Sequence, residues 1–79
     1  MEAYILISTE PGILWKVAEA ACKVEGVKTA HAVTGQFDVV VFVEFQKIDE
    51  LGKIIEKIQH INGVRRTQTL IALPPTIRE

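Results

Sequence analysis

The residues of this sequence with the clearest chemical potential follow a single glycine. Gly35, Phe37 and Asp38 place a flexible turn, an aromatic side chain and a carboxylate close together in the chain. Exposed backbone amides at such a turn can bind a carboxylate, and an aspartate can bind an ammonium group. The combination is suited to a free amino acid. A plainer interpretation stays open: Gly35 makes the turn, Phe37 fills the core and Asp38 is solvated.

Two threonines are a second, weaker candidate for a binding surface. Thr67 and Thr69 are separated by one residue, so in an extended segment their hydroxyl groups lie on the same side. Threonine is also a common strand residue, so this pair alone is weak evidence of a site.

Residues for catalysis or metal binding do not form a recognisable set. His31 and His60 fall on different expected elements, and Cys22, the only cysteine, falls inside an expected helix. Such isolated side chains are more often packing or surface residues than bases, nucleophiles or ligands. The sequence has no metal-ligand spacing and no phosphate-binding glycine loop. We therefore expect a protein that is not an enzyme, with no catalytic residue, metal or cofactor.

Charge and composition narrow the range of partners. Nine basic and ten acidic residues give a net charge of -1, whereas contact with nucleic acid normally requires a concentrated basic surface. No apolar run approaches the roughly 18 to 20 residues that span a bilayer. We expect a cytoplasmic domain that binds neither nucleic acid nor a membrane directly.

The elements that must position these residues follow the order βαββαβ. Short β-prone runs, rich in apolar, β-branched and aromatic residues and bounded by glycine and proline, predict strands over 3–7, 27–34, 37–45 and 64–73. Apolar residues at three- and four-residue spacing predict a helix over 13–24 and a second that ends near Ile61. Asp49 is the expected N-cap of the second helix.

An internal similarity indicates how these elements pack. Val24 to Thr29 and Ile61 to Arg66 both read as helix end, glycine, valine, basic residue and strand start. Two βαβ units joined by a hairpin give the ferredoxin-like α+β fold, a four-stranded antiparallel sheet in the order 4-1-3-2 with both helices on one face.

The face of the sheet away from the helices should be polar in a monomer, and the third strand contradicts this. Phe37, Val39, Val41, Val43 and Phe45 alternate along one side, which we expect to be the core. The other side carries Asp38, Val40, Phe42 and Glu44. A hairpin loop at Gly35-Gln36 places His31 and Val33 beside them. Exposed apolar area of this kind usually marks an interface, so we expect dimerisation through the open sheet face.

The segments from Val33 to Val41 (VTGQFDVVV) and from Ile61 to Thr69 (INGVRRTQT) closely resemble the effector-binding (RAM) domain of the Lrp/AsnC transcriptional regulators. The resemblance covers nearly the whole chain. It implies a domain involved in transcription regulation that dimerises through its sheet, often forms octamers as tetramers of dimers, and binds amino acids at subunit interfaces.

The resemblance also assigns residues. Gly35, Phe37 and Asp38 would line the ligand cleft from the hairpin, and Thr67 and Thr69 would face it from the last strand. Phe37 replaces a more usual tyrosine and removes a hydroxyl donor. The family's helix-turn-helix domain is absent, so residues 1–79 are expected to be a stand-alone ligand-binding and oligomerisation domain that acts alone or with full-length regulators.

Three alternatives can be compared at this level, and the first two stay open. The first is a purely structural module that assembles without a ligand. The second is an ACT-like regulatory domain of a metabolic enzyme, a type that has its glycine in the first strand-to-helix loop, where Pro11-Gly12 lies. The third, an acylphosphatase-like enzyme, would need an arginine in that loop, and the segment from Ser8 to Gly12 contains none.

Overall fold

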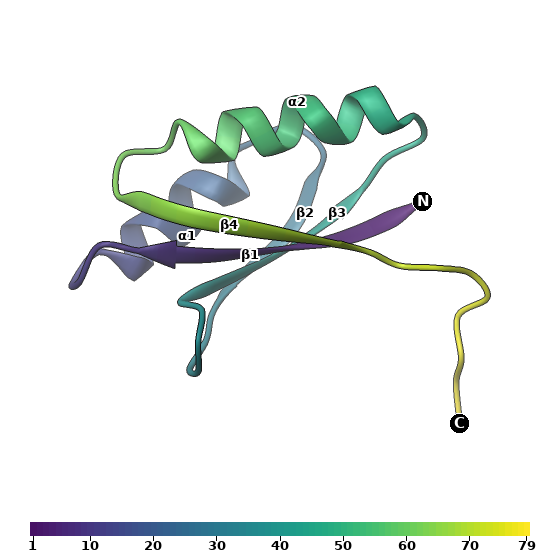
Figure 1. Ribbon diagram of the computed structural model, residues 1–79, viewed down its shortest axis with the longest axis horizontal. Coiled ribbons are helices and arrows are strands. Elements are labelled where there is room, and N and C mark those ends of the chain that lie inside the picture. Colours follow the sequence, from purple (N-terminus) through teal and green to yellow (C-terminus); the bar gives the residue numbers. More distant parts are fainter.

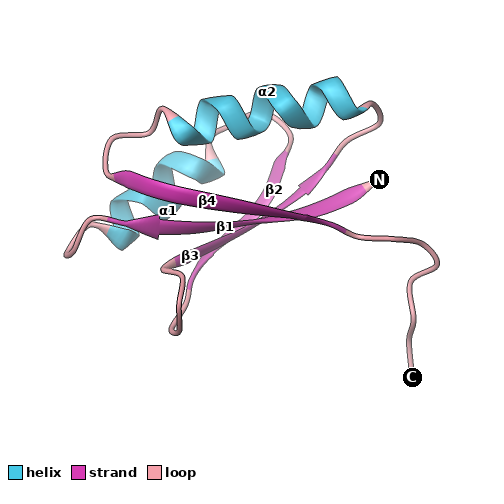
Figure 2. Ribbon diagram, viewed as in Figure 1, coloured by secondary structure: helices cyan, strands magenta, loops and turns pink.

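A computed structural model describes residues 1–79 and contains one sheet covered on one side by two helices (Figures 1 and 2). The elements are β1 (Glu2–Thr9), α1 (Leu14–Cys22), β2 (Val27–Ala32), β3 (Val39–Glu44), α2 (Ile48–Gln59) and β4 (Val64–Ile71). The strand order β2-β3-β1-β4 and the antiparallel pairing confirm the predicted ferredoxin-like arrangement. None of the helices has the length and apolar character needed to cross a membrane.

The two central strands, β1 and β3, set the register of the sheet. Ile5 pairs with Val41 of β3 and with Thr69 of β4. His31 of β2 lies opposite Val40, as the predicted hairpin register requires. A one-residue slip would exchange the buried and open faces, so this register decides which side chains remain outside the core.

The core occupies the layer between the sheet and the helices. It combines alternate residues of β1 and β3 with the apolar stripes of α1 and α2. Its thirteen members are Ala3, Ile5, Ile7, Val17, Ala18, Ala21, Val39, Val41, Val43, Phe45, Leu51, Ile54 and Ile58. Burying each of the larger side chains contributes about 1.5 to 3 kcal/mol before the cost of ordering the chain. All thirteen lie on one side of the sheet or on the helices that cover it.

The start of α2 differs from the prediction. Lys47 is the N-cap residue and Asp49 lies within the first turn, so the expected Asp49 cap is wrong. Glu50 reaches back instead, and its Oε1 accepts hydrogen bonds from the backbone N–H of Gln46 at 2.9 Å and of Lys47 at 3.4 Å. The bond from Gln46, followed by that from Lys47, lowers the pKa of Glu50 below its usual 4.5.

The open face of the sheet carries apolar side chains that the protomer does not cover. Tyr4 is 42% exposed and Leu70 45%, and Leu6, Val40 and Phe42 are half-buried. The rings of Tyr4 and Phe42, on paired positions of β1 and β3, have centroids 5.3 Å apart. The face predicted to be apolar is therefore apolar in the folded chain.

Candidate functional site

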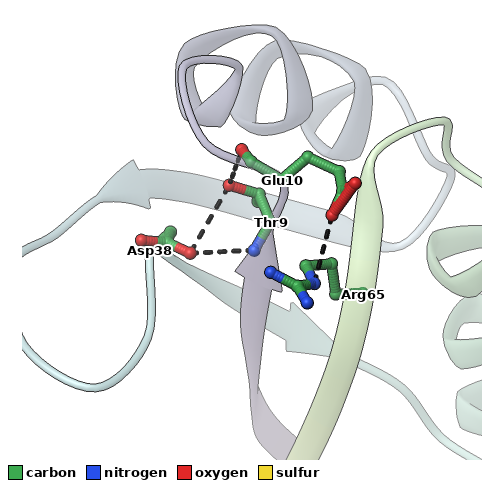
Figure 3. A network of polar contacts seen from close by, with 4 residues as sticks. All are labelled: Thr9, Glu10, Asp38 and Arg65. Carbon is green, nitrogen blue, oxygen red and sulfur yellow. Dashed lines mark hydrogen bonds and ion pairs between the residues drawn. The ribbon is translucent and has the colours of Figure 1, made fainter.

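Asp38 is held by neighbouring segments through both its backbone and its side chain, and Figure 3 shows the side-chain contacts. Its backbone N–H donates to the carbonyl of Ile7 at 2.8 Å, and its carbonyl accepts from the N–H of Val33 at 2.9 Å. Its Oδ2 accepts from the backbone N–H of Thr9 at 2.8 Å, and the Thr9 hydroxyl lies 3.4 Å from the same oxygen. Asp38 is thus fixed at the end of β1 and is not simply solvated. The other carboxylate oxygen, Oδ1, has no partner in the protomer.

Asp38 lies in a polar depression formed by three segments. The lining residues are Ser8, Thr9, Asp38, Arg65 and Arg66, from the end of β1, the end of the hairpin loop and the start of β4. The Nε of Arg65 lies 3.1 Å from Oε2 of Glu10, and Figure 3 shows this ion pair beside the Thr9–Asp38 contacts. Arg66 has no carboxylate partner.

Phe37 does not enter the core, which corrects the expectation that it fills the buried face of the third strand. It precedes β3 and is half-buried. The guanidinium carbon of Arg66 lies 5.4 Å from the centroid of its ring, within the range of a cation–π contact. Phe37 therefore connects the hairpin loop to β4.

Gly35 lies at the exposed tip of the hairpin. Its φ of +120° is a conformation that other residues rarely adopt, and a Cβ at this position would meet nothing within 4 Å. The glycine is therefore required by the backbone path of the turn and not by a close contact within the protomer.

Thr67 and Thr69 lie on the opposite side of β4 from this depression. They pair with Ile7 and Ile5, whose side chains are buried beneath the helices. The hydroxyl of Thr67 accepts a hydrogen bond of 3.2 Å from Nε2 of Gln59 in α2. Arg66 precedes Thr67 and points to the other face, so one protomer brings Asp38, Phe37 and Arg66 together but does not bring the two threonines to them.

The sequence interpretation missed Ser8, Thr9 and Arg66 as neighbours of Asp38. The strand pairing could have identified these neighbours. Ile7 pairs with Val39, and one further step along both strands places Ser8 beside Asp38. Ser8 in turn pairs with Arg66 across β4. A register assigned to all the strands would have placed these residues together.

The remaining chemically active side chains form no second site. His31 lines a shallow groove on the open face with Tyr4, Thr29, Val40 and Phe42. Nδ1 of His60 lies 2.8 Å from the carbonyl of Glu56 in its own helix, and Cys22 is exposed. No three His, Cys, Asp or Glu side chains converge as metal ligands.

Comparisons with known proteins show which family and which relatives this chain resembles. Residues 2–79 match the family model described as the Lrp/AsnC ligand binding domain. An uncharacterised HTH-type transcriptional regulator of Pyrococcus furiosus is 40% identical, over 98% of this chain and 53% of its own length. The chain thus spans about half the length of the curated relatives it matches.

Two solved structures are similar to this chain in fold. The crystal structure of TTHA0845 from Thermus thermophilus superposes with a TM-score of 0.90 at 29% identity, covering 98% of both chains. AsnC from Escherichia coli superposes with a TM-score of 0.86 at 26% identity, over 99% of this chain and 54% of AsnC.

Proposed function

Because the chain belongs to the Lrp/AsnC family, whose ligand-binding domain it matches from residue 2 to residue 79, we propose that it binds a free amino acid and assembles with copies of itself. The matched relatives are transcriptional regulators and not enzymes. The domain acts in transcription regulation in the cytoplasm, alone or assembled with full-length regulators, and does not itself contact DNA.

The observation that carries the proposal is the carboxylate of Asp38. It is held by the Thr9 backbone at 2.8 Å, so one oxygen has a structural role while the other is free to accept from a ligand. An amino acid offers an ammonium group with three donors for such an oxygen. A fixed carboxylate also loses little conformational entropy when it binds.

The binding cleft is shared between protomers. Gly35, Phe37 and Asp38 belong to the hairpin side, whereas Thr67 and Thr69 face α2 on the other side of β4. Both sets can contact one ligand only if the threonines come from a neighbouring copy. This arrangement supports a site at a subunit interface, the position that the family resemblance implies.

The open face of the sheet is the interface through which two copies associate. Tyr4 and Leu70 leave more than two fifths of their surface exposed on the face that no helix covers. Apolar side chains gathered on a face of this kind favour burial against a partner. A second copy presents the same surface, and a two-fold axis makes it self-complementary. A dimer is the minimum assembly, and a tetramer of dimers is compatible with it.

Two measurements test the proposal. Titration calorimetry against the twenty amino acids should reveal at least one ligand, and sedimentation velocity at micromolar concentration should show a dimer or a larger species. Silence across the panel from an assembled protein would favour a purely structural module. A monomer at that concentration would contradict assembly.

Variants in β4 test the shared cleft. Thr67→Val and Thr69→Val keep the side-chain shape and the strand propensity but remove a hydroxyl, and each should weaken amino-acid binding by about tenfold if the hydroxyl contacts the ligand. Thr76→Val, in the exposed tail, is the matched control and should bind as the wild type does. Unchanged affinity in both β4 variants would remove these threonines from the site.

A further inference from the structure

We infer that Arg66 receives the α-carboxylate of the bound amino acid and that Phe37 holds its guanidinium for this contact. This inference rests on the proposed function, because it adds a residue to the same site. Arg66 is not among the residues that the family resemblance assigns to the cleft.

The first support is that Arg66 is the arginine of the depression that forms no ion pair within the protomer. Arg65 is paired with Glu10 at 3.1 Å, whereas Arg66 has no acidic partner in the protomer. Its guanidinium lies against the Phe37 ring at 5.4 Å. Stacking on an aromatic face occupies the plane of a guanidinium and leaves its edge N–H groups free for a carboxylate.

The second support is the separation of charge across the depression. Asp38 presents a fixed carboxylate from the hairpin and Arg66 a guanidinium from β4, with Ser8 of β1 also in the lining. An amino acid carries the complementary pair, an ammonium and a carboxylate on one carbon. The depression therefore contains a group of opposite charge for each charged group of the ligand within one protomer.

The charge balance specifies the class of ligand. Arg65 and Arg66 contribute two positive charges, and Asp38 and Glu10 contribute two negative charges, so the sum around the depression is zero. A ligand without net charge leaves this balance undisturbed, whereas an acidic or basic side chain adds an unmatched charge. The site should prefer amino acids with uncharged side chains.

The same geometry explains how phenylalanine can replace tyrosine in the hairpin. The contact with Arg66 uses the face of the ring, which tyrosine and phenylalanine share, and needs no hydroxyl. Phe37 acts through Arg66 and is a positioning residue. Phe37→Tyr should therefore retain carboxylate recognition, whereas Phe37→Leu should weaken it.

The test varies the ligand and the protein together. For each amino acid that binds in the calorimetric panel, its carboxamide is titrated alongside it, for example L-leucine and L-leucinamide. The wild type should prefer the carboxylate form by about 10- to 100-fold, the range of a charge-assisted contact. Arg66→Gln should reduce this preference to less than about threefold, while Arg78→Gln, in the exposed C-terminal tail outside the depression, should retain it.

The possible outcomes distinguish a failure of the Arg66 role from a failure of amino-acid binding itself. If Arg66→Gln binds amino acids with the wild-type preference for the carboxylate, the role of Arg66 is refuted and amino-acid binding stands. If no amino acid binds the wild type, both fail. Sedimentation of Arg66→Gln should match the wild type, and a changed oligomeric state would make Arg66 an assembly residue and overturn the inference. A Phe37→Leu variant with undiminished preference would refute its positioning role.

Discussion

Replacing Asp38 separates the structural role of its oxygen from the role of its charge. Asp38→Ala removes the acceptor for the backbone N–H of Thr9, a residue that is only 7% exposed. A buried donor without a partner costs about 1 to 3 kcal/mol. The Thr9 hydroxyl has a second acceptor, the carbonyl of Glu10 at 3.1 Å, and so adds little to this cost. We expect Asp38→Ala to lower the free energy of unfolding by about 1 to 3 kcal/mol.

Asp38→Asn should behave differently, because its amide oxygen can still accept from Thr9 while its charge is lost. It should cost less than about 1 kcal/mol, the difference between a charged and a neutral acceptor. In amino-acid binding, however, the two variants should be similar, each losing about tenfold or more in affinity as the ammonium loses its ionic partner.

Urea unfolding followed by circular dichroism measures the free energy of unfolding, and titration calorimetry measures the amino-acid affinity. Both are done at one fixed protein concentration. The diagnostic result is that Asp38→Asn folds nearly as stably as the wild type yet binds as poorly as Asp38→Ala. An Asp38→Ala protein within 0.5 kcal/mol of the wild type, on the order of the smallest hydrogen-bond contribution, would refute the structural role. An Asp38→Asn protein with full affinity would refute the role of the charge.

Further predictions concern the interface, two glycines and the start of α2. Phe42→Ser should weaken self-association by about tenfold or more in sedimentation equilibrium, through the loss of about 1.5 to 3 kcal/mol of apolar burial at the open face; unchanged association would place the interface elsewhere. Gly63→Ala should lower the free energy of unfolding in urea more than Gly35→Ala, because a Cβ at Gly63 (φ +96°) meets Cδ1 of Ile13 whereas one at Gly35 meets nothing. The positive φ alone destabilises both variants by about 1 to 2 kcal/mol. Equal losses of stability in the two variants would contradict the contact with Ile13. The stabilisation from Glu50, whose folded pKa is lowered, should be complete above pH 4.5 and should be lost as the pH falls through the folded pKa. The difference in unfolding free energy between wild type and Glu50→Ala should therefore shrink at acid pH, and a constant difference would refute the cap.

Local patterns were sufficient to predict most of the fold. Glycines with positive φ, Gly26 and Gly63, follow both helices and directly precede β2 and β4, as the internal similarity predicts. The strict alternation of β3 identified its buried and open faces, and the pairing of His31 with Val40 confirms the register. Each of these features depends on residues that are close in sequence, or on one short hairpin.

The two errors occur where a residue's environment depends on a specific contact that periodicity does not describe. Asp49 has the side chain of an N-cap, but Glu50 reaches back to two backbone N–H groups and the N-cap is Lys47, two residues earlier. Phe37 continues the alternation of β3 in sequence, yet the pairing of β3 with β1 ends at Val39. Its ring therefore lies outside the core and contacts Arg66 of β4. Periodicity cannot register either effect, because the first is a local contact between a side chain and the backbone and the second is a tertiary contact between the hairpin and β4.

On the proposed function, ligand binding and assembly share a surface. By alternation along β1, Ser8 lies on the same sheet face as Tyr4, and Arg66 of β4 pairs with Ser8. A partner that covers the apolar part of this face must approach the edge of the depression that contains Asp38. Any ligand that binds more tightly beside a partner must strengthen association by the same factor, since coupling between two binding events is reciprocal. If an amino acid at Asp38 binds more tightly when a partner covers the sheet face, its binding therefore strengthens association of the copies.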